Sequence, residues 1–220
     1  MSYGVTVLTL EPLDFNMIGN SLVQNLQGLP TRGHKVIKVQ YPASFAATSI
    51  DQGVAALDTL VKNTAGYKLV YGHSQGAQVA SRWLRTHATD SNAPAANTME
   101  FLFIGNPLRK YGGYIIGKPE VGGQTGLPTL NNTQYNVTDV KLQYDGWCDQ
   151  PTRYNVFAKA NASIGMGKQH CFGYRTADLN DPARKTYQEN TTLYVMLPSK
   201  PLTRFCPQSS IEAAYTRPEV

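Results

Sequence analysis

The sequence predicts an α/β fold, with a central, mostly parallel sheet that carries helices on both faces. Short runs rich in β-branched residues alternate with segments of helical period along the chain. A glycine-rich turn joins one of these predicted strands to one of these predicted helices. The 220 residues are expected to form a single domain, 1–220, because one hydrophobic core can still grow to this size.

Strand and helix units fill the first half of the chain. Strands rich in branched or aromatic residues are expected at 5–10, 36–41, 67–71 and 101–104. Ser49 followed by Gln52 is typical of a capping box and predicts a helix that begins there. Another helix is expected from Gln75 to His87. A further helix is indicated before Gly28 by apolar residues at helical spacing: Ile18, Leu22, Val23 and Leu26.

The second half opens with a break in this alternation. Six glycines fall within 111–126, too many for the interior of a helix or a strand, so this segment is expected to form a mobile flap or lid. A strand is then expected at 140–144, a helix at 153–164 and an edge strand at 192–197. Parallel strands end at one shared edge of the sheet, which is where functional residues are expected.

Composition excludes several classes of protein. Hydrophobic residues make up 41% and charged residues 16%, which argues against a disordered chain. The longest apolar runs are strand-sized, so we expect a soluble protein without a membrane-spanning helix. The N-terminus lacks the pattern of a signal peptide. Synthesis in the cytoplasm is therefore expected, with action there or after another kind of export.

Charge and cysteine usage narrow the list of partners. The net charge is +5, but lysines and arginines are scattered, so no nucleic-acid partner is expected. Cys148, Cys171 and Cys206 lack the CxxC spacing of a zinc site, so no metal is expected. Cys148 and Cys171 either form one disulfide or remain free thiols.

The strongest functional signal is Gly72-His73-Ser74-Gln75-Gly76, a G-x-S-x-G pattern between a predicted strand and a predicted helix. In such a turn the backbone is strained and holds the serine above the sheet edge, and the flanking glycines leave room for it. Ser74 is therefore the candidate nucleophile of an α/β-hydrolase fold. The N–H of Gln75, at the helix N-terminus, is the candidate oxyanion donor, and a second donor is left open.

A serine nucleophile needs an imidazole within hydrogen-bond reach and a carboxylate that fixes the tautomer of that imidazole. His34 precedes a strand far from the expected functional edge, and His73 lies inside the turn itself. His87 ends a helix, where it can cap carbonyl groups. His170, expected in a loop after the last helix, is the candidate base.

The candidate acid is Asp145, which directly follows the predicted strand at 140–144. It lies between Ser74 and His170 in the chain order serine, acid, histidine. Asp149 is the reserve, because only geometry decides which carboxylate reaches the imidazole. A triad of this kind needs neither an organic cofactor nor a metal ion.

The turn and the acid segment together resemble the PE-PPE-domain esterases of mycobacteria, which are serine α/β-hydrolases related to cutinases and to lysin B of mycobacteriophages. The resemblance implies a cutinase-like fold with Ser74, Asp145 and His170 as nucleophile, acid and base. The chain departs from the family in having no glycine before Gly19 in the loop that usually supplies the second oxyanion N–H. The other similar segments are Ile104-Gly105-Asn106-Pro107-Leu108-Arg109, Tyr144-Asp145-Gly146-Trp147-Cys148-Asp149-Gln150-Pro151, Asn155 through Gly165, and Thr191-Thr192-Leu193-Tyr194.

The resemblance implies hydrolysis of carboxylic esters of a lipid or of mycolic acid through an acyl-enzyme. A mycobacterial cell-envelope glycolipid is among the substrates it implies, with action at the cell envelope or as a phage-encoded protein. Low charge content and the flap at 111–126 suit an apolar acyl groove. Two alternatives stay open: acyl transfer to a sugar hydroxyl, and a phage virion component that keeps the fold with a silent site.

Overall fold

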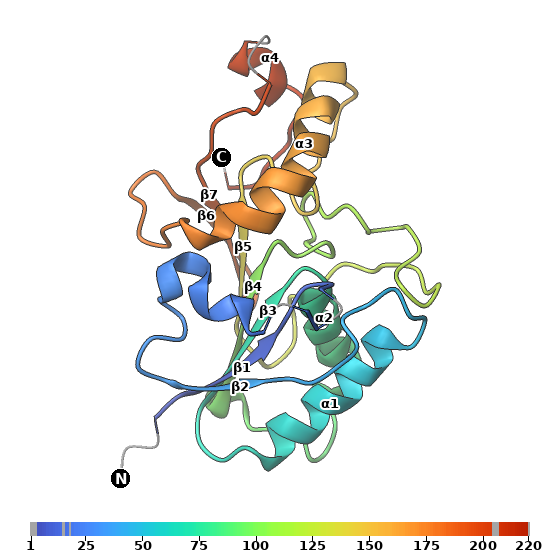
Figure 1. Ribbon diagram of the computed structural model, residues 1–220, viewed down its shortest axis with the longest axis vertical. Coiled ribbons are helices and arrows are strands. Elements are labelled where there is room, and N and C mark those ends of the chain that lie inside the picture. Colours follow the sequence, from blue (N-terminus) through green and yellow to red (C-terminus); the bar gives the residue numbers. More distant parts are fainter. Residues whose placement is uncertain (1–3, 15, 18, 204–206, 220) are drawn as a thin grey trace.

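The computed structural model describes residues 4–14, 16–17, 19–203 and 207–219 and contains a seven-stranded sheet. The strand order is β2-β1-β3-β4-β5-β7-β6 (Figure 1). Neighbouring strands are parallel except for the antiparallel pair of β6 and β7. The predicted α/β-hydrolase class is confirmed. The strands are β1 Thr6–Leu10, β2 Lys35–Lys38, β3 Lys68–His73, β4 Met99–Ile104, β5 Val137–Leu142, β6 Lys185–Glu189 and β7 Thr192–Leu197.

The two faces of the sheet are covered differently. Alternate strand residues point to opposite faces, so Leu8 and Val70 pack with the apolar sides of α1 and α2, whereas Tyr71 packs with Leu22 of η1 and Tyr174 of η3. No helix in the described part of the chain has the length and apolar character needed to cross a membrane. The helices are α1 Ser49–Asn63, α2 Gln75–His87, α3 Val156–Phe172 and α4 Gln208–Glu212, with 3-10 helices η1 Ser21–Gly28, η2 Ala96–Thr98 and η3 Gly173–Arg175.

The helix expected before Gly28 is of a different type. Ser21–Gly28 consists of short 3-10 turns interrupted by a kink, where Leu26 and Gln27 have φ of 54° and 57°, values that a continuous helix does not contain. Leu22 and Leu26 are nevertheless buried. The apolar spacing therefore identified core-facing side chains but not the helix type, and Ile18 lies outside the described residues.

Helix α1 begins at Ser49 as predicted, but the capping box is not formed. Thr48 is the N-cap, and its side chain makes no capping hydrogen bond. The Ser49 hydroxyl donates instead to Gln75 Oε1 at 3.1 Å and accepts from Ser44 N at 3.1 Å. Ser49 therefore ties α1 to the first residue of α2, beside the Ser74 turn.

The predicted helix at 153–164 is shifted, and this changes the setting of the candidate base. Helix α3 runs from Val156 to Phe172, so His170 lies in its last turn and not in a loop. Asn155 starts the helix by accepting hydrogen bonds from Phe157 N and Ala158 N, both at 3.0 Å. The helix continues past Gly165, which approaches the carbonyl of Tyr144 so closely that no Cβ fits between them.

The predicted edge strand is present as β7 but is not at the edge. It lies between β5 and β6, and β6 forms the edge of the sheet. The sequence of β6, Lys-Thr-Tyr-Gln-Glu, carries no buried residue, which suits an exposed edge but leaves no apolar pattern by which to predict it.

The segment at 111–126 is a loop with two isolated β-bridges, Ile116 to Gly126 and Pro119 to Thr125. Its buried Glu120 accepts a hydrogen bond from Gln78 of α2 at 3.1 Å and forms an ion pair with Arg82 of the same helix. The loop is thus attached to α2 at one point, and its mobility stays a prediction.

Candidate active site

Ser74 lies between β3 and α2 in a strained turn. Its φ of 55° and ψ of −117° fall outside the regions that L residues ordinarily occupy. A Cβ at Gly72 would lie 2.9 Å from the carbonyl oxygen of Gly76, and a Cβ at Gly76 would overlap the carbonyl of Leu10. Both glycines are therefore required by close approach of the backbone on either side of the serine.

Asp145 and His170 form a buried pair. His170 Nδ1 lies 2.9 Å and 3.1 Å from the two carboxylate oxygens of Asp145, which is fully buried. An ionised carboxylate only accepts hydrogen bonds, so Nδ1 carries the proton and Nε2 is left with a lone pair. Trp147 N and the Tyr174 hydroxyl also donate to Asp145, at 3.0 Å and 2.9 Å. The acid is thus held by donors on several sides.

The imidazole of His170 lies close to the Ser74 turn. A Cβ at Gly105 would be 2.8 Å from His170 Nδ1, while Ser74 N donates to the preceding carbonyl, that of Ile104, at 3.3 Å. The rings of His73 and His170 have centroids 4.7 Å apart. His170 Nε2 is buried and has no hydrogen-bond partner among the described residues. This nitrogen is therefore available to accept a proton.

His73 is a neutral neighbour of this pair. Burial, followed by the adjacent His170, lowers the pKa of His73 well below its usual value. Both of its ring nitrogens are buried without a hydrogen-bond partner in the described part of the chain. His73 therefore packs against the His170 ring without competing for Asp145.

Asp149, the reserve acid, is engaged elsewhere. Arg217 donates to its two carboxylate oxygens at 2.9 Å and 2.7 Å, Tyr144 N donates at 2.8 Å, and Lys141 Nζ lies 3.2 Å away. Burial alone raises the pKa of Asp149, but these cations outweigh burial and bring the pKa down to about 2. The geometry thus brings Asp145 to the imidazole and commits Asp149 to a structural ion pair.

The N-terminus of α2 is fixed by its first side chain. Gln75 is buried, accepts from the Ser49 hydroxyl and donates to the carbonyl of Ser44 at 2.9 Å. Its own N–H has no hydrogen-bond partner among the described residues, as an oxyanion donor requires. The facing loop after β1 is held by the buried carboxylate of Glu11, which accepts from Ser21 N at 3.0 Å.

Tyr174 contacts the candidate acid, and the sequence analysis did not single it out. Burial raises the pKa of its hydroxyl well above the usual value, so the phenol stays protonated and donates to Asp145. Its position four residues after His170, on the continuation of one helix, is the signal that could have identified it. Cys148 is a buried free thiol and Cys171 an exposed one, so they form no disulfide, and Cys206 lies outside the described residues.

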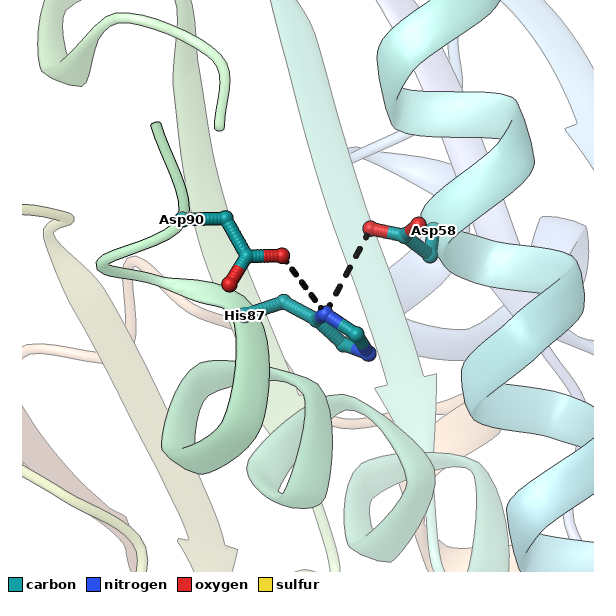
Figure 2. A group of neighbouring side chains, drawn as sticks. All are labelled: Asp58, His87 and Asp90. Carbon is teal, nitrogen blue, oxygen red and sulfur yellow. Dashed lines mark hydrogen bonds and ion pairs between the residues drawn. The ribbon is translucent and has the colours of Figure 1, made fainter. Parts of the chain in front are cut away.

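A histidine and two carboxylates meet at the far end of α2, where a metal ion could be considered. Figure 2 shows the His87 ring directed at both carboxylates, with Nδ1 2.8 Å from Asp90 and 3.9 Å from Asp58. Lys62 Nζ already lies 2.7 Å from Asp58 and 3.7 Å from Asp90, and the hydrogen bond with Asp58 raises the pKa of this lysine. An ammonium group thus supplies the positive charge here. His87 was expected to cap a helix carbonyl, but within the described part of the chain its Nδ1 faces Asp90 instead.

The sequence model of the PE-PPE domain family matches residues 28–213, which include Ser74, Asp145 and His170. The chain belongs to the PE-PPE domain family. Esterase PE16 of Mycobacterium tuberculosis is 30% identical over 181 residues, which cover 77% of this chain and 33% of that protein. The SL1278 acyltransferase Chp1 of the same organism is 28% identical over 166 residues, which cover 70% of this chain and 40% of the relative.

This PE-PPE domain therefore spans between a third and two fifths of the length of these two relatives. Among solved structures, lysin B from mycobacteriophage D29 is similar over 63% of each chain, with 20% identity and a TM-score of 0.41. A likeness of this size carries no information about activity. The assignment to the family rests on the sequence match.

Proposed function

We propose that this PE-PPE domain hydrolyses carboxylic esters of lipids through an acyl-enzyme formed on Ser74. The observation that carries the proposal is the buried pair of Asp145 and His170 beside the strained turn that presents Ser74. The family supports ester chemistry, because one similar relative is named an esterase and another an acyltransferase.

The proposed reaction uses groups with separate roles. The Ser74 oxygen attacks the ester carbonyl carbon while its proton passes to His170 Nε2, and the N–H of Gln75 donates to the oxyanion that forms. When the C–O bond breaks, His170 returns the proton to the departing alcohol. Water then attacks the acyl-enzyme by the same route and releases the acid. Asp145 stabilises the imidazolium and fixes its orientation throughout.

A fluorophosphonate probe tests this proposal, because it reacts covalently with an activated serine. Wild type is expected to label, and Ser74→Ala is expected not to label and to hydrolyse none of a series of p-nitrophenyl esters of graded chain length. Ser81→Ala is the control, since Ser81 is a buried serine inside α2, seven residues after Ser74, and its hydroxyl bonds to Thr129. A folded wild type that does not label would instead support a silent hydrolase fold with a binding role.

Acyl transfer is the second candidate, and the similarity to the SL1278 acyltransferase Chp1 favours it. Transfer and hydrolysis share the acyl-enzyme and differ only in whether a sugar hydroxyl or water attacks it. With a long-chain acyl donor and trehalose present, hydrolysis predicts free fatty acid as the product. A trehalose ester that forms at the expense of free acid would assign the domain to transfer.

A further inference from the structure

Helix α3 exposes most of its larger apolar side chains to solvent, although Met166 is partly buried. A surface helix normally buries an apolar stripe and exposes charged residues. In α3 the buried positions are Ala158, Asn161, Ala162, Gly165 and His170, which are small or polar. Among the exposed residues are Val156, Phe157, Ile164 and Phe172, with exposed fractions of 59%, 49%, 39% and 69%.

Five exposed residues of α3 form one continuous face, and Phe172 lies to one side of it. Phe157, Ala160, Ile164, Gly167 and Cys171 follow one another at spacings of three and four residues, and all five are exposed. This spacing places them along the outward line of one helix. In Figure 1, α3 lies next to α4 and apart from α1 and α2, so neither of those two helices covers this face.

The charges on this face are all positive. Lys159 and Lys168 are exposed and, at 100° per residue, lie on either side of the apolar line. No Asp or Glu occurs anywhere in α3. The exposed Arg153 precedes the helix, and the exposed Arg175 follows it. An apolar centre between lysines that can extend sideways is typical of helices that lie in a lipid interface.

We propose that the exposed face of α3, which comprises Val156, Phe157, Lys159, Ala160, Ile164, Gly167, Lys168 and Cys171, binds the surface of anionic lipid aggregates. The inference rests on the proposed function, because it supplies the route by which a water-insoluble lipid ester reaches the site. His170 lies in the last turn of the same helix, so a surface that receives α3 is brought next to the candidate base. The 88% exposed Tyr154, just before α3, adds an aromatic group suited to such an interface.

Charge favours an anionic lipid surface over a second copy of the chain as the partner of this face. A spacing of three and four residues also suits a helix pair, but α3 has 17 residues, about two heptads, against the three to four heptads that identify a coiled coil. An antiparallel second copy would bring Lys159 close to Lys168 of the other chain, with no acidic residue on either helix to pair with them. Anionic headgroups complement the same lysines.

Flotation with lipid vesicles tests the proposal. Wild type is expected to float with phosphatidylcholine vesicles that contain phosphatidylglycerol. Two lysines near an anionic surface strengthen partitioning by about 30-fold together, so Lys159→Gln with Lys168→Gln should lose about that factor on these vesicles only. Phe157→Gln with Ile164→Gln should weaken binding to vesicles with and without the anionic lipid, because it removes apolar area. Leu29→Gln and Lys185→Gln, exposed residues outside α3, are the controls for loss of an apolar side chain and of a positive charge.

The experiments distinguish failure of the proposed esterase activity from failure of the proposed lipid-binding face. Ser74→Ala should float like wild type while hydrolysing nothing, and the α3 variants should hydrolyse dissolved p-nitrophenyl butyrate at the wild-type rate but act slowly on vesicle-bound esters. Wild type that does not float with anionic vesicles overturns the lipid-binding face. So does a dimer in light scattering that dissociates in the Phe157 and Ile164 variant, because the face is then covered by a second copy.

Discussion

Replacing Asp145 by Asn is the sharpest test of the candidate triad, because the donors around the carboxylate dictate how the amide must lie. Trp147 N–H donates to Oδ1 at 3.0 Å and cannot act as an acceptor. The amide oxygen must therefore occupy the Oδ1 position, and the NH2 group takes the place of Oδ2, which lies 2.9 Å from both His170 Nδ1 and the Tyr174 hydroxyl. The tyrosine hydroxyl can rotate to accept.

His170 Nδ1 then faces the NH2 group at 2.9 Å and the amide oxygen at 3.1 Å. The nearer NH2 group favours a hydrogen bond accepted at Nδ1, which places the imidazole proton on Nε2. An imidazole with a proton on Nε2 cannot take the proton of Ser74, although every atom of the site keeps its place. In serine hydrolases with this arrangement the wrong tautomer lowers kcat by about 10⁴-fold, which corresponds to about 5 kcal/mol of transition-state stabilisation. We expect a loss of that order in ester hydrolysis and an equally slow reaction with fluorophosphonate.

Asp149→Asn is the matched control, since it makes the same change four residues away. It leaves Arg217 and Lys141 buried without their shared carboxylate, and breaking a buried ion pair in this way costs about 3 to 5 kcal/mol of folding stability. Its folded fraction, measured by circular dichroism, should fall, while the rate per folded molecule stays within a few fold of wild type. If Asp149→Asn abolishes turnover per folded molecule and Asp145→Asn leaves it within tenfold, the assignment of the acid is wrong.

Three further predictions follow from single contacts. Gly76→Ala should lower the free energy of unfolding by several kcal/mol in urea titration, because the new Cβ overlaps the Leu10 carbonyl, and a wild-type midpoint would refute that contact. The pKa of Asp149 is about 2 in the folded protein and about 3.9 in an unfolded chain, so its contribution to folding stability is full above pH 4 and is lost as the pH falls to 2. When the free energy of unfolding is measured against pH, Asp149→Asn should flatten this part of the curve. Iodoacetamide should modify exposed Cys171 in the native protein but buried Cys148, whose thiol pKa is raised by burial, only after unfolding, as peptide mass spectrometry can show.

Local patterns predicted the parts of the site that depend on local chemistry. The turn around Ser74 needs a glycine on each side of the serine, and that requirement is visible in five consecutive letters. Asp145 was placed by the end of a strand and by chain order. The ion pair of the reserve acid is visible only in the structure, because Arg217 reaches Asp149 from 68 residues further along the chain. No local spacing indicates such a partner.

The same limit applies to the buried charges that surround the sheet edge. Arg109 is fully buried between Asp139 and Glu219, and Glu219 also faces Lys141 at 3.3 Å. Each of these residues reads as an ordinary surface charge when only its neighbours in sequence are considered. Burial becomes tolerable because all the charges are paired, and the pairing needs the C-terminal segment to return to the sheet.

Helix α3 shows where pattern reading fails for a physical reason. Apolar periodicity locates a helix by the stripe that it buries, but α3 approaches the acid loop through Gly165 and Ala162, whose carbonyl lies against Gly146. Close backbone approach requires small residues, and small residues carry almost no hydropathy signal. The larger apolar side chains Val156, Phe157 and Ile164 lie on the outer face, where 59%, 49% and 39% of each stays exposed. Small residues at the buried positions therefore account for two findings. The C-terminal part of α3, where His170 lies, was not predicted to be helical, and the larger apolar side chains lie on the exposed face that we propose binds lipid.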